Sequence, residues 1–360
     1  MKITNLIAAV AALAMLSGCA KKSEAPSENN TRIVWNYGNV YENGMLKSDN
    51  MNRLSFFDFD TFQSALLCSK PNCTHKSADD CSAFGMSNHP ILYNDKLYFF
   101  HSDWENDVDE IVDITTVWKA DTDGTNRTKV CTVEGLRLQE YTRMLVIDNM
   151  LYFSMSKTDW DMDIGASTGN NECWLCSYDL STNTFTRIEC LREEWAGSTW
   201  IYGLYDGKMV FYFSYSDRHV FTVEEVEKYI TDVYKTYDIE SGEIADLTLP
   251  KPLVVEGGYY IYEKDGGVAV LNEKGDELLL PDFPTKGGVT VADGKLFNFF
   301  EKKCADLTSG KMYALNLSED FGNSFVAFAD GNYILEQVDY DTQTYEYYKI
   351  DKKDLIGDAL

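Results

Sequence analysis

The chain has 360 residues, of which 58 are acidic and 32 are basic, and its formal net charge is -26. This charge argues against a nucleic-acid-binding protein, because such proteins neutralise phosphates with lysine and arginine. Since 44% of the residues are hydrophobic, the chain can bury a core and is not a disordered acidic protein. An aromatic share of 14% with only seven prolines favours a protein rich in β-strands.

The N-terminal segment has the pattern of an export signal. Lys2 is the only charged residue before an apolar run from Leu6 to Leu16, and the sequence LSGC follows and ends at Cys19. This run is too short to span a bilayer as a mature helix. The ending resembles a bacterial lipobox, which implies cleavage before Cys19 and acylation of its sulfur; a plain signal peptide with a chance cysteine is the alternative. We therefore predict a lipoprotein signal peptide over residues 1–18 and a lipid-anchored flexible tether over residues 19–30.

The predicted anchor sets the predicted location. Two acyl chains hold a protein on a membrane, whereas one chain gives only marginal attachment. The acidic charge disfavours direct docking on anionic headgroups, so the lipid on Cys19 must supply the attachment. We expect an exported monomer attached to the bacterial cell membrane or outer membrane.

Seven tight turn signals recur over residues 31–360, each between two short alternating apolar segments. Asparagine, aspartate and glycine tolerate the positive φ that such hairpin turns require. The turns are Asn43-Gly44, Asn94-Asp95, Asp148-Asn149, Asp206-Gly207, Gly257-Gly258, Asp293-Gly294 and Asp330-Gly331. A second hairpin follows each turn, ending with YYKIDKKDLI in the last repeat. Four strands per repeat predict an all-β protein, a seven-bladed β-propeller; a six- or eight-bladed propeller and an array of β-sandwiches are the alternatives.

One hairpin carries a family resemblance. The segment VWKADTDGTNRTKV, from Val117 to Val130, resembles the strand, Asp-Gly turn and strand of TolB-like propellers, and similar strings occur in uncharacterised bacterial propeller lipoproteins. The Trp-Ser-Pro-Asp-Gly strand start typical of TolB repeats is missing. The resemblance implies a propeller fold and a binding role, and it transfers no catalytic residue.

The long connections all belong to one class. If the strands of a blade are labelled a to d, the a–b and c–d turns lie at one end of the sheet, and the b–c loops and d–a crossovers lie at the other. The long segments are b–c loops or d–a crossovers: 69–89, 102–115, 156–172, 192–198 and 216–231. We predict one insertion-bearing face, because long loops on a rigid scaffold commonly bind ligands. The capping-box spacing of Thr222 and Glu225 predicts a short helix in the last insertion.

These insertions combine acidic and aromatic side chains. The predicted binding residues are Trp104, Asp159, Trp160, Asp161, Asp163, Trp195 and Trp200. The alternate carboxylates of residues 159–163 supply the oxygen ligands that a calcium ion takes, although the spacing does not match an EF-hand. A solvated charge run around a half-buried tryptophan is the alternative interpretation.

The crossover from the first to the second repeat contains Cys68, Cys73, His75 and Cys81. Three thiolates and one imidazole match the ligand set of a closed structural zinc site. Export would favour disulfides instead, for example between Cys73 and Cys81. Free thiols are the third alternative, whereas a metal ion or a disulfide would each make this loop a structural staple.

The sequence contains no nucleophile elbow, zinc-protease helix or phosphate-binding glycine loop. We therefore expect a non-catalytic, membrane-anchored scaffold that binds a protein, peptide or glycan ligand on the insertion-bearing face. One alternative is a carbohydrate-active enzyme with paired carboxylates on that face. Another is a partner in envelope assembly, suggested by the TolB-like hairpin.

Cys19→Ser is expected to abolish acylation, because serine has no sulfur to carry the lipid. Metabolic labelling with an alkyne palmitate analogue, followed by membrane fractionation, measures this loss. Cys190→Ser is the matched control and should keep both the label and the membrane location. Undiminished labelling of Cys19→Ser would contradict the predicted lipidation.

Overall fold

The computed structural model describes residues 31–34, 38–41, 43–49, 51–78, 80–86, 89–106, 111–138, 142–161, 166–218, 223–318, 323–339 and 344–360. The predicted signal peptide, Cys19 and the tether lie outside these residues. The chain divides into two compact units: unit 1 contains Met1–Ile201 and Tyr212–Val233, and unit 2 contains Tyr202–Phe211 and Tyr234–Leu360. None of the helices in the described residues has the length and apolar composition needed to span a bilayer.

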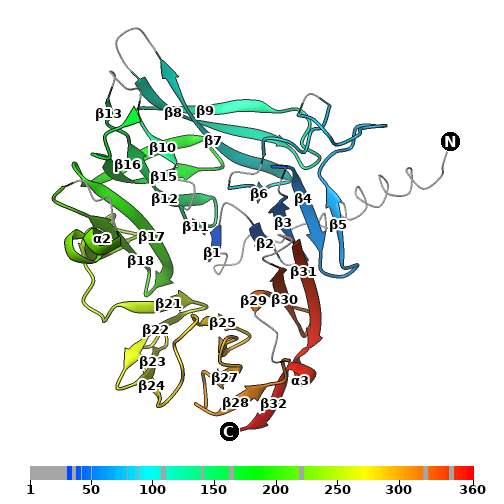
Figure 1. The fold of residues 1–360 in the computed structure, drawn as a ribbon, viewed down its shortest axis with the longest axis vertical. Helices are drawn as coiled ribbons and strands as arrows, with labels where there is room; N and C mark the ends of the chain where they lie inside the picture. Colours follow the sequence, from blue (N-terminus) through cyan, green and yellow to red (C-terminus); the bar gives the residue numbers. More distant parts are fainter. Residues whose placement is uncertain are drawn as a thin grey trace. The chain divides into compact units, whose positions relative to one another are not determined.

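The fold is a seven-bladed β-propeller, as predicted. Seven small antiparallel sheets of the described strands are the blades, numbered here blade 1 to blade 7 in chain order (Figure 1). Blades 1 to 3 contain β2 (Gly38–Tyr41), β3 (Gly44–Ser48), β4 (Leu54–Asp58), β5 (Gln63–Leu66), β6 (Ile91–Tyr93), β7 (Lys96–Asn106), β8 (Ile111–Asp121), β9 (Thr128–Glu134), β11 (Met144–Ile147), β12 (Met150–Lys157), β15 (Glu172–Asp179) and β16 (Thr184–Arg192). The alternatives of six or eight blades and of a sandwich array are therefore wrong.

The remaining blades follow the same antiparallel order. Blades 4 and 5 contain β17 (Ala196–Tyr205), β18 (Lys208–Tyr215), β19 (Thr231–Asp238), β20 (Ile244–Asp246), β21 (Pro252–Glu256), β22 (Tyr259–Lys264), β23 (Gly267–Leu271) and β24 (Glu277–Leu280). Blades 6 and 7 contain β25 (Thr290–Ala292), β26 (Lys295–Asn298), β27 (Lys303–Asp306), β28 (Met312–Leu315), β29 (Asn323–Ala329), β30 (Asn332–Asp339) and β31 (Thr344–Asp351).

All seven predicted turns connect the first two strands of a blade. In blade 4, Asp206 and Gly207 have φ values of 51° and 71°, and in blade 6 Asp293 and Gly294 have 48° and 65°. Positive φ at both central positions matches the twist of the flanking strands. The local turn chemistry of the sequence was thus sufficient to locate the inner hairpin of each blade.

An acceptor side chain at the end of the third strand is a second repeated feature. One side-chain oxygen accepts the backbone N–H two residues later in every blade. The residues are Asp58, Asp123, Asp179, Asp238, Asn272, Asp306 and Asp351. Such side-chain turns satisfy donors that the strand ladder leaves unpaired, so they fix the start of the segment that follows the third strand.

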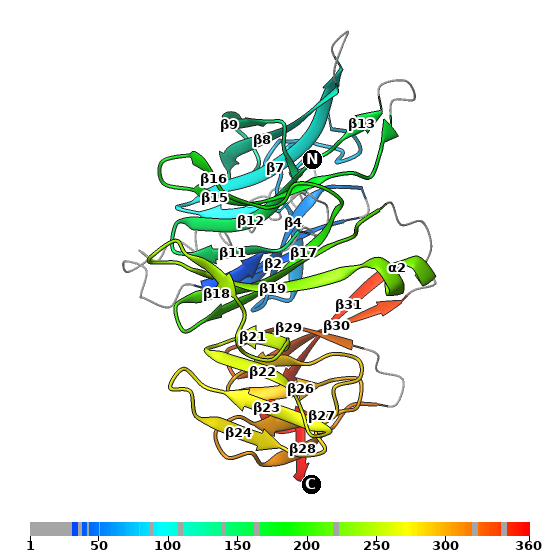
Figure 2. The same cartoon turned by 90° about the vertical axis from the view of Figure 1, so that its left-hand side faces the viewer.

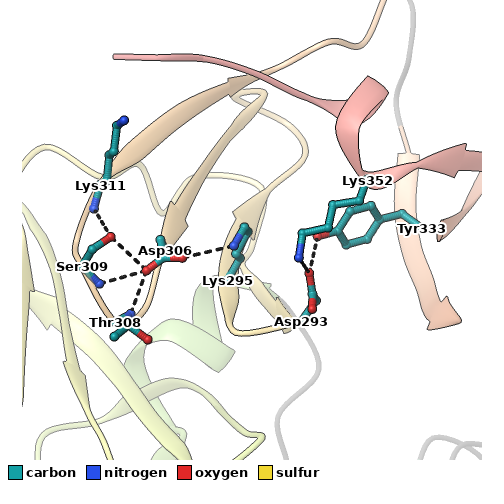
Figure 3. A network of polar contacts seen from close by, with 8 residues as sticks. All are labelled: Asp293, Lys295, Asp306, Thr308, Ser309, Lys311, Tyr333 and Lys352. Carbon is teal, nitrogen blue, oxygen red and sulfur yellow. Dashed lines mark hydrogen bonds and ion pairs between the residues drawn. The ribbon is translucent and has the colours of Figure 1, made fainter. Parts of the chain in front are cut away.

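Blade 6 shows the arrangement in detail (Figure 3). Asp306 Oδ1 accepts the backbone N–H groups of Thr308 and Ser309 at 3.1 and 2.9 Å, and Asp306 Oδ2 lies 3.1 Å from Nζ of Lys295 on β26. The hydrogen bond from the Ser309 backbone, with those from its hydroxyl and from Lys295, lowers the pKa of Asp306 to about 2, although burial acts to raise it. The carboxylate therefore connects the c–d turn to the neighbouring strand in its charged form.

Blade 7 differs from the prediction. The segment expected to form its outer hairpin contains the short helix α3 (Lys352–Leu355), capped by the side chain of Asp351, and then β32 (Ile356–Ala359). β32 pairs with β28 of blade 6, and blade 7 has three strands. The buried Leu355 packs in the apolar cluster between blades 6 and 7, which directs the chain back to blade 6.

The N-terminal strand β1 (Thr31–Val34) was not expected as part of a blade. It pairs antiparallel with β11 of blade 3, with Val34 opposite Met144. Val34 is fully buried in an apolar cluster formed mainly by blades 2 and 3. This burial fixes the beginning of the described chain on blade 3.

The acidic turns predict a defined loss of stability in acid. Because the folded-state pKa of Asp306 lies below its ordinary value, its carboxylate stabilises the fold above about pH 4, and this contribution is lost as the pH falls toward 2. Asp306→Ala should cost about 1 kcal/mol of unfolding free energy at pH 7 and less at pH 2. Urea unfolding at several pH values measures both effects. The exposed Asp358→Ala is the control, and a pH-independent difference for Asp306→Ala would contradict the assignment.

Candidate functional site

The connection between β5 and β6 brings three thiols and one imidazole together. The candidate ligand atoms of Cys68, Cys73, His75 and Cys81 all lie within 4.8 Å of one another. Nδ1 of His75 is 3.2 Å from Sγ of Cys81, and Sγ of Cys73 is 3.4 Å from the carbonyl oxygen of Asp80. Within the described ranges, no other group of three or more His, Cys, Asp or Glu side chains is arranged to hold a metal ion. The predicted metal residues therefore converge, and we call them the Cys/His centre.

The surroundings of the Cys/His centre act in opposite directions on two of its thiols. Burial raises the pKa of Cys68, but hydrogen bonds from Ser82, from the Lys70 backbone and from Cys73 outweigh it and lower the pKa to about 7. Burial raises the pKa of Cys81 to about 11, and the neighbouring Cys68 sulfur adds to that rise. A thiolate is the form in which cysteine binds metals, and Cys68 reaches that form at a lower pH than Cys81 does.

Side chains that the sequence analysis missed anchor this loop on blade 2. Ser69 donates to Asp123 Oδ2 at 2.5 Å, and Ser82 donates to the carbonyl oxygen of Asp123 at 2.9 Å. Arg127 donates to the carbonyl oxygen of Phe84 at 2.6 Å. Asp123 and Arg127 belong to the TolB-like string in the c–d turn of blade 2. That string was the feature of the sequence that could have pointed to these anchoring residues.

Arg53 connects the same loop to blade 1. It donates to the carbonyl oxygen of His75 at 2.8 Å and pairs with Asp49, and both residues flank the b–c turn between β3 and β4. The crossover was predicted to lie on the insertion-bearing face. Arg53 holds it at the b–c turn of blade 1, which is the predicted end, and Ser69 and Ser82 also attach it to Asp123 in the c–d turn of blade 2.

The eight cysteines within the described residues carry free thiols in the structure. Cys173 is buried, with its Sγ 3.1 Å from the hydroxyl oxygen of Thr199, and burial raises its pKa to about 11. Burial also raises the pKa of Cys176. These two thiols are packing groups of blade 3 and lack the low pKa of a reactive cysteine.

The other predicted insertions are connected by hydrogen bonds within unit 1. Thr158 N donates to Asp113 Oδ2 at 2.8 Å, which connects the insertions of blades 2 and 3. Trp195 N donates to Asn170 Oδ1 at 3.0 Å, and Ser216 N donates to the carbonyl oxygen of Trp195 at 3.1 Å. We call the described residues of 102–115, 156–172, 192–198 and 216–231 the insertion surface. These hydrogen bonds join the described parts of the insertions of blades 2, 3 and 4.

Small elements order the insertion surface. β13 (Trp160–Asp161) pairs with β14 (Ala166–Ser167), and Asp159 Oδ2 accepts the hydroxyl of Thr168 at 2.8 Å. The predicted helix is present as α2 (Val223–Tyr229). In Figure 2, β13 and α2 lie at the same end of the sheets of unit 1. Of the predicted binding residues here, Asp159 is exposed, and Trp160 and Asp161 are half-buried.

The remaining predicted binding residues are placed differently from one another. Trp195 is half-buried in the crossover to blade 4. The Arg143 guanidinium lies 4.4 Å above the ring of Trp200, so this ring is partly covered by a cation. The backbone of Trp104 is in β7, but its side chain and all of Asp163 lie outside the described residues. The calcium interpretation therefore stays a prediction.

A buried histidine was also missed. His89 Nε2 contacts the carbonyl oxygen of Thr142 at 2.7 Å, and burial lowers its pKa to about 4. A neutral, buried imidazole at the connection into β6 fastens the starts of blades 2 and 3. It is therefore a packing group of the propeller.

Neither a protein-family model nor a curated protein matches the chain. Among solved structures, an oligogalacturonate lyase in complex with manganese is 10% identical, with 89% of this chain and 90% of that chain covered and a TM-score of 0.49. An acylaminoacyl peptidase from Pyrococcus horikoshii is 13% identical, with 89% and 51% covered and a TM-score of 0.48, so this chain spans about half of that protein. Both are β-propeller proteins, and the likeness concerns the fold alone.

The prediction that this chain is not an enzyme is corrected. The lyase and the peptidase are enzymes built with the same class of fold. The lack of familiar catalytic motifs in the sequence therefore gives no ground for a non-catalytic assignment.

The contact between the crossover and blade 2 can be tested at Gly124. A Cβ on Gly124, at φ 74°, would lie 2.3 Å from the carbonyl oxygen of Ser82, whereas one on Gly207, at φ 71°, would meet nothing within 4 Å. Gly124→Ala should therefore cost about 3 kcal/mol of unfolding free energy, and Gly207→Ala about 1 kcal/mol from backbone strain alone. Urea unfolding followed by tryptophan fluorescence measures the difference. Equal losses would show that the crossover does not pack against this turn.

Proposed function

We propose that this protein is an exported lipoprotein, anchored to the membrane through Cys19, whose propeller domain binds a neutral glycan on the insertion surface. The observation that carries the proposal is the hydrogen-bonded continuity of that surface. Asp113, Asn170 and Trp195 join insertions that are far apart in the sequence. A binding site on loops needs such support, because ordering loosely held side chains when the ligand binds costs free energy and weakens the affinity.

The chemistry of the surface favours a sugar. Trp160 and Trp195 are half-buried, so each combines an apolar ring with a fixed position. Asp159 and Asp161 add acceptors for hydroxyl groups beside the first ring. A net charge of -26 disfavours an acidic ligand, so a neutral glycan fits better than an anionic one.

Other partners are outcomes of the test. The TolB-like string gives some support to an envelope-assembly partner, but its Asp123 and Arg127 hold the crossover of blade 1. We retain the expectations of a monomer and of no nucleic-acid partner. Catalysis on a bound glycan stays open and is measured in the same experiment.

The proposal includes a structural metal ion in the Cys/His centre. Thiolate and imidazole ligands favour zinc, whereas calcium takes oxygen ligands. The hydrogen bonds that hold this centre run to Arg53 and Ser82, and neither residue belongs to the insertion surface. A metal ion there would support the fold and would not contact the glycan.

Binding can be measured by calorimetric titration of the solubilised mature protein with cello- and xylo-oligosaccharides, with oligogalacturonate as the anionic comparison. Trp160→Ala and Asp161→Asn should each weaken binding of a neutral oligosaccharide by about tenfold, equivalent to about 1.4 kcal/mol. Asp246→Asn, an exposed position on β20, is the matched control and should bind as the unchanged protein does.

The same samples decide between the alternatives. No heat of binding with any neutral oligosaccharide, or equal affinity in all three variants, would overturn the glycan site. Release of new reducing ends during the titration would show that the surface is catalytic. Binding of a peptide in place of a sugar would show that the ligand is a peptide and not a glycan.

A further inference from the structure

We propose that Cys68, Cys73, His75 and Cys81 bind one zinc ion in a closed tetrahedral site that fastens blade 1 to blade 2. The inference deepens the metal part of the proposed function and rests on it. It concerns the crossover of residues 67–90, so it is independent of the glycan-binding part.

The geometry fits zinc closely. Tetrahedral zinc with sulfur at about 2.3 Å and nitrogen at about 2.0 Å places its ligand atoms about 3.5–3.8 Å apart. The four candidate atoms lie within 4.8 Å of one another, and Nδ1 of His75 is already 3.2 Å from Sγ of Cys81. Side-chain rotations that draw the sulfurs inward by about 1 Å would complete the tetrahedron.

The ligand set favours zinc over the simpler alternatives. A disulfide would use two of the three sulfurs and would leave the third sulfur and the imidazole without a role. Calcium and magnesium prefer oxygen ligands, and the four candidate atoms are sulfur and nitrogen. Three cysteines and one histidine fill all four positions of zinc, so no position remains for water or substrate and the ion is structural.

The loop itself needs a crosslink. Between Ser69 and Asp80 the described residues have no strand or helix, and each of them is exposed or half-buried. Asn72 and His75 have φ values of 61° and 55°, a region that costs energy for residues with a side chain. Apolar burial cannot hold such a segment in place, whereas metal binding supplies ordering free energy directly.

The hydrogen bonds around the centre give the ion a wider effect. Arg53, in the b–c turn of blade 1, donates to the carbonyl oxygen of His75. Ser69 and Ser82, which flank the outer ligands Cys68 and Cys81, both bond to Asp123 in the c–d turn of blade 2. Zinc would lock these anchors together, so its removal should loosen the contact between the two blades.

The test uses the solubilised mature protein, purified under reducing conditions with zinc and then dialysed. Elemental analysis should give about one zinc per chain, and cobalt substitution should give the intense absorption of a tetrahedral thiolate site. Strong chelation should lower the unfolding temperature by at least about 5 °C. Cys73→Ser and His75→Ala should lose the metal, whereas Cys131→Ser, a half-buried thiol outside the centre, should keep it.

Several outcomes would overturn the proposal. These are a metal-free protein with four intact ligands, a Cys73–Cys81 disulfide in the purified chain, or an iron–sulfur absorption spectrum. Cobalt spectra of the unchanged protein do not depend on whether a variant folds. The readouts are metal content and stability, so failure here leaves glycan binding intact, and failure of glycan binding leaves the zinc site intact.

Discussion

Each blade depends on a side-chain acceptor that ends its third strand and holds the following turn. Antiparallel sheets need a fixed reversal at this point, because backbone N–H groups that leave the ladder must find new partners. Asp179 and Asp306 supply such acceptors as carboxylates, and Asn272 supplies one as an amide. The acceptor recurs at or just beyond the end of the third strand in every blade, so it holds the chain reversal at that end of the sheet. The b–c loops and the d–a crossovers are therefore free to vary at the other end.

The c–d turn of blade 2 also anchors the crossover from blade 1. Its Asp123 closes the turn by accepting the backbone N–H of Thr125, and it also receives hydrogen bonds from Ser69 and Ser82 of the crossover. Gly124 is required beside it, because any side chain would collide with the Ser82 carbonyl. The resemblance of this string to TolB-like propellers thus falls on a structural anchor. A motif that stabilises a turn can also serve as a docking point for a neighbouring segment, and its presence does not by itself identify a binding function.

The acidic composition acts differently in different parts of the chain. Many carboxylates are fixed by turns or by cross-strand lysines, as Asp121 is by Lys96, and these serve the fold. Others, such as Asp159 and Asp161, lie on the insertion surface beside Trp160. All eight arginines precede residue 219, and Arg143, Arg192 and Arg218 stack on aromatic rings. The loops of blades 3 and 4 therefore carry cations within an acidic chain, held in place by ring contacts.

The sequence by itself determined the seven inner hairpins, the blade number, the short helix α2 and the four residues of the Cys/His centre, because turn chemistry and ligand spacing are local. It did not reveal that β1 joins blade 3 or that β32 returns to blade 6, since strand exchange depends on which apolar surfaces remain uncovered. Nor did it reveal that the crossover, which was predicted to lie with the other insertions, also reaches the c–d turn of blade 2. Only the tertiary structure decided that, because the position depends on hydrogen bonds from Arg53 and to Asp123, contacts between segments too distant in sequence for any local pattern to record.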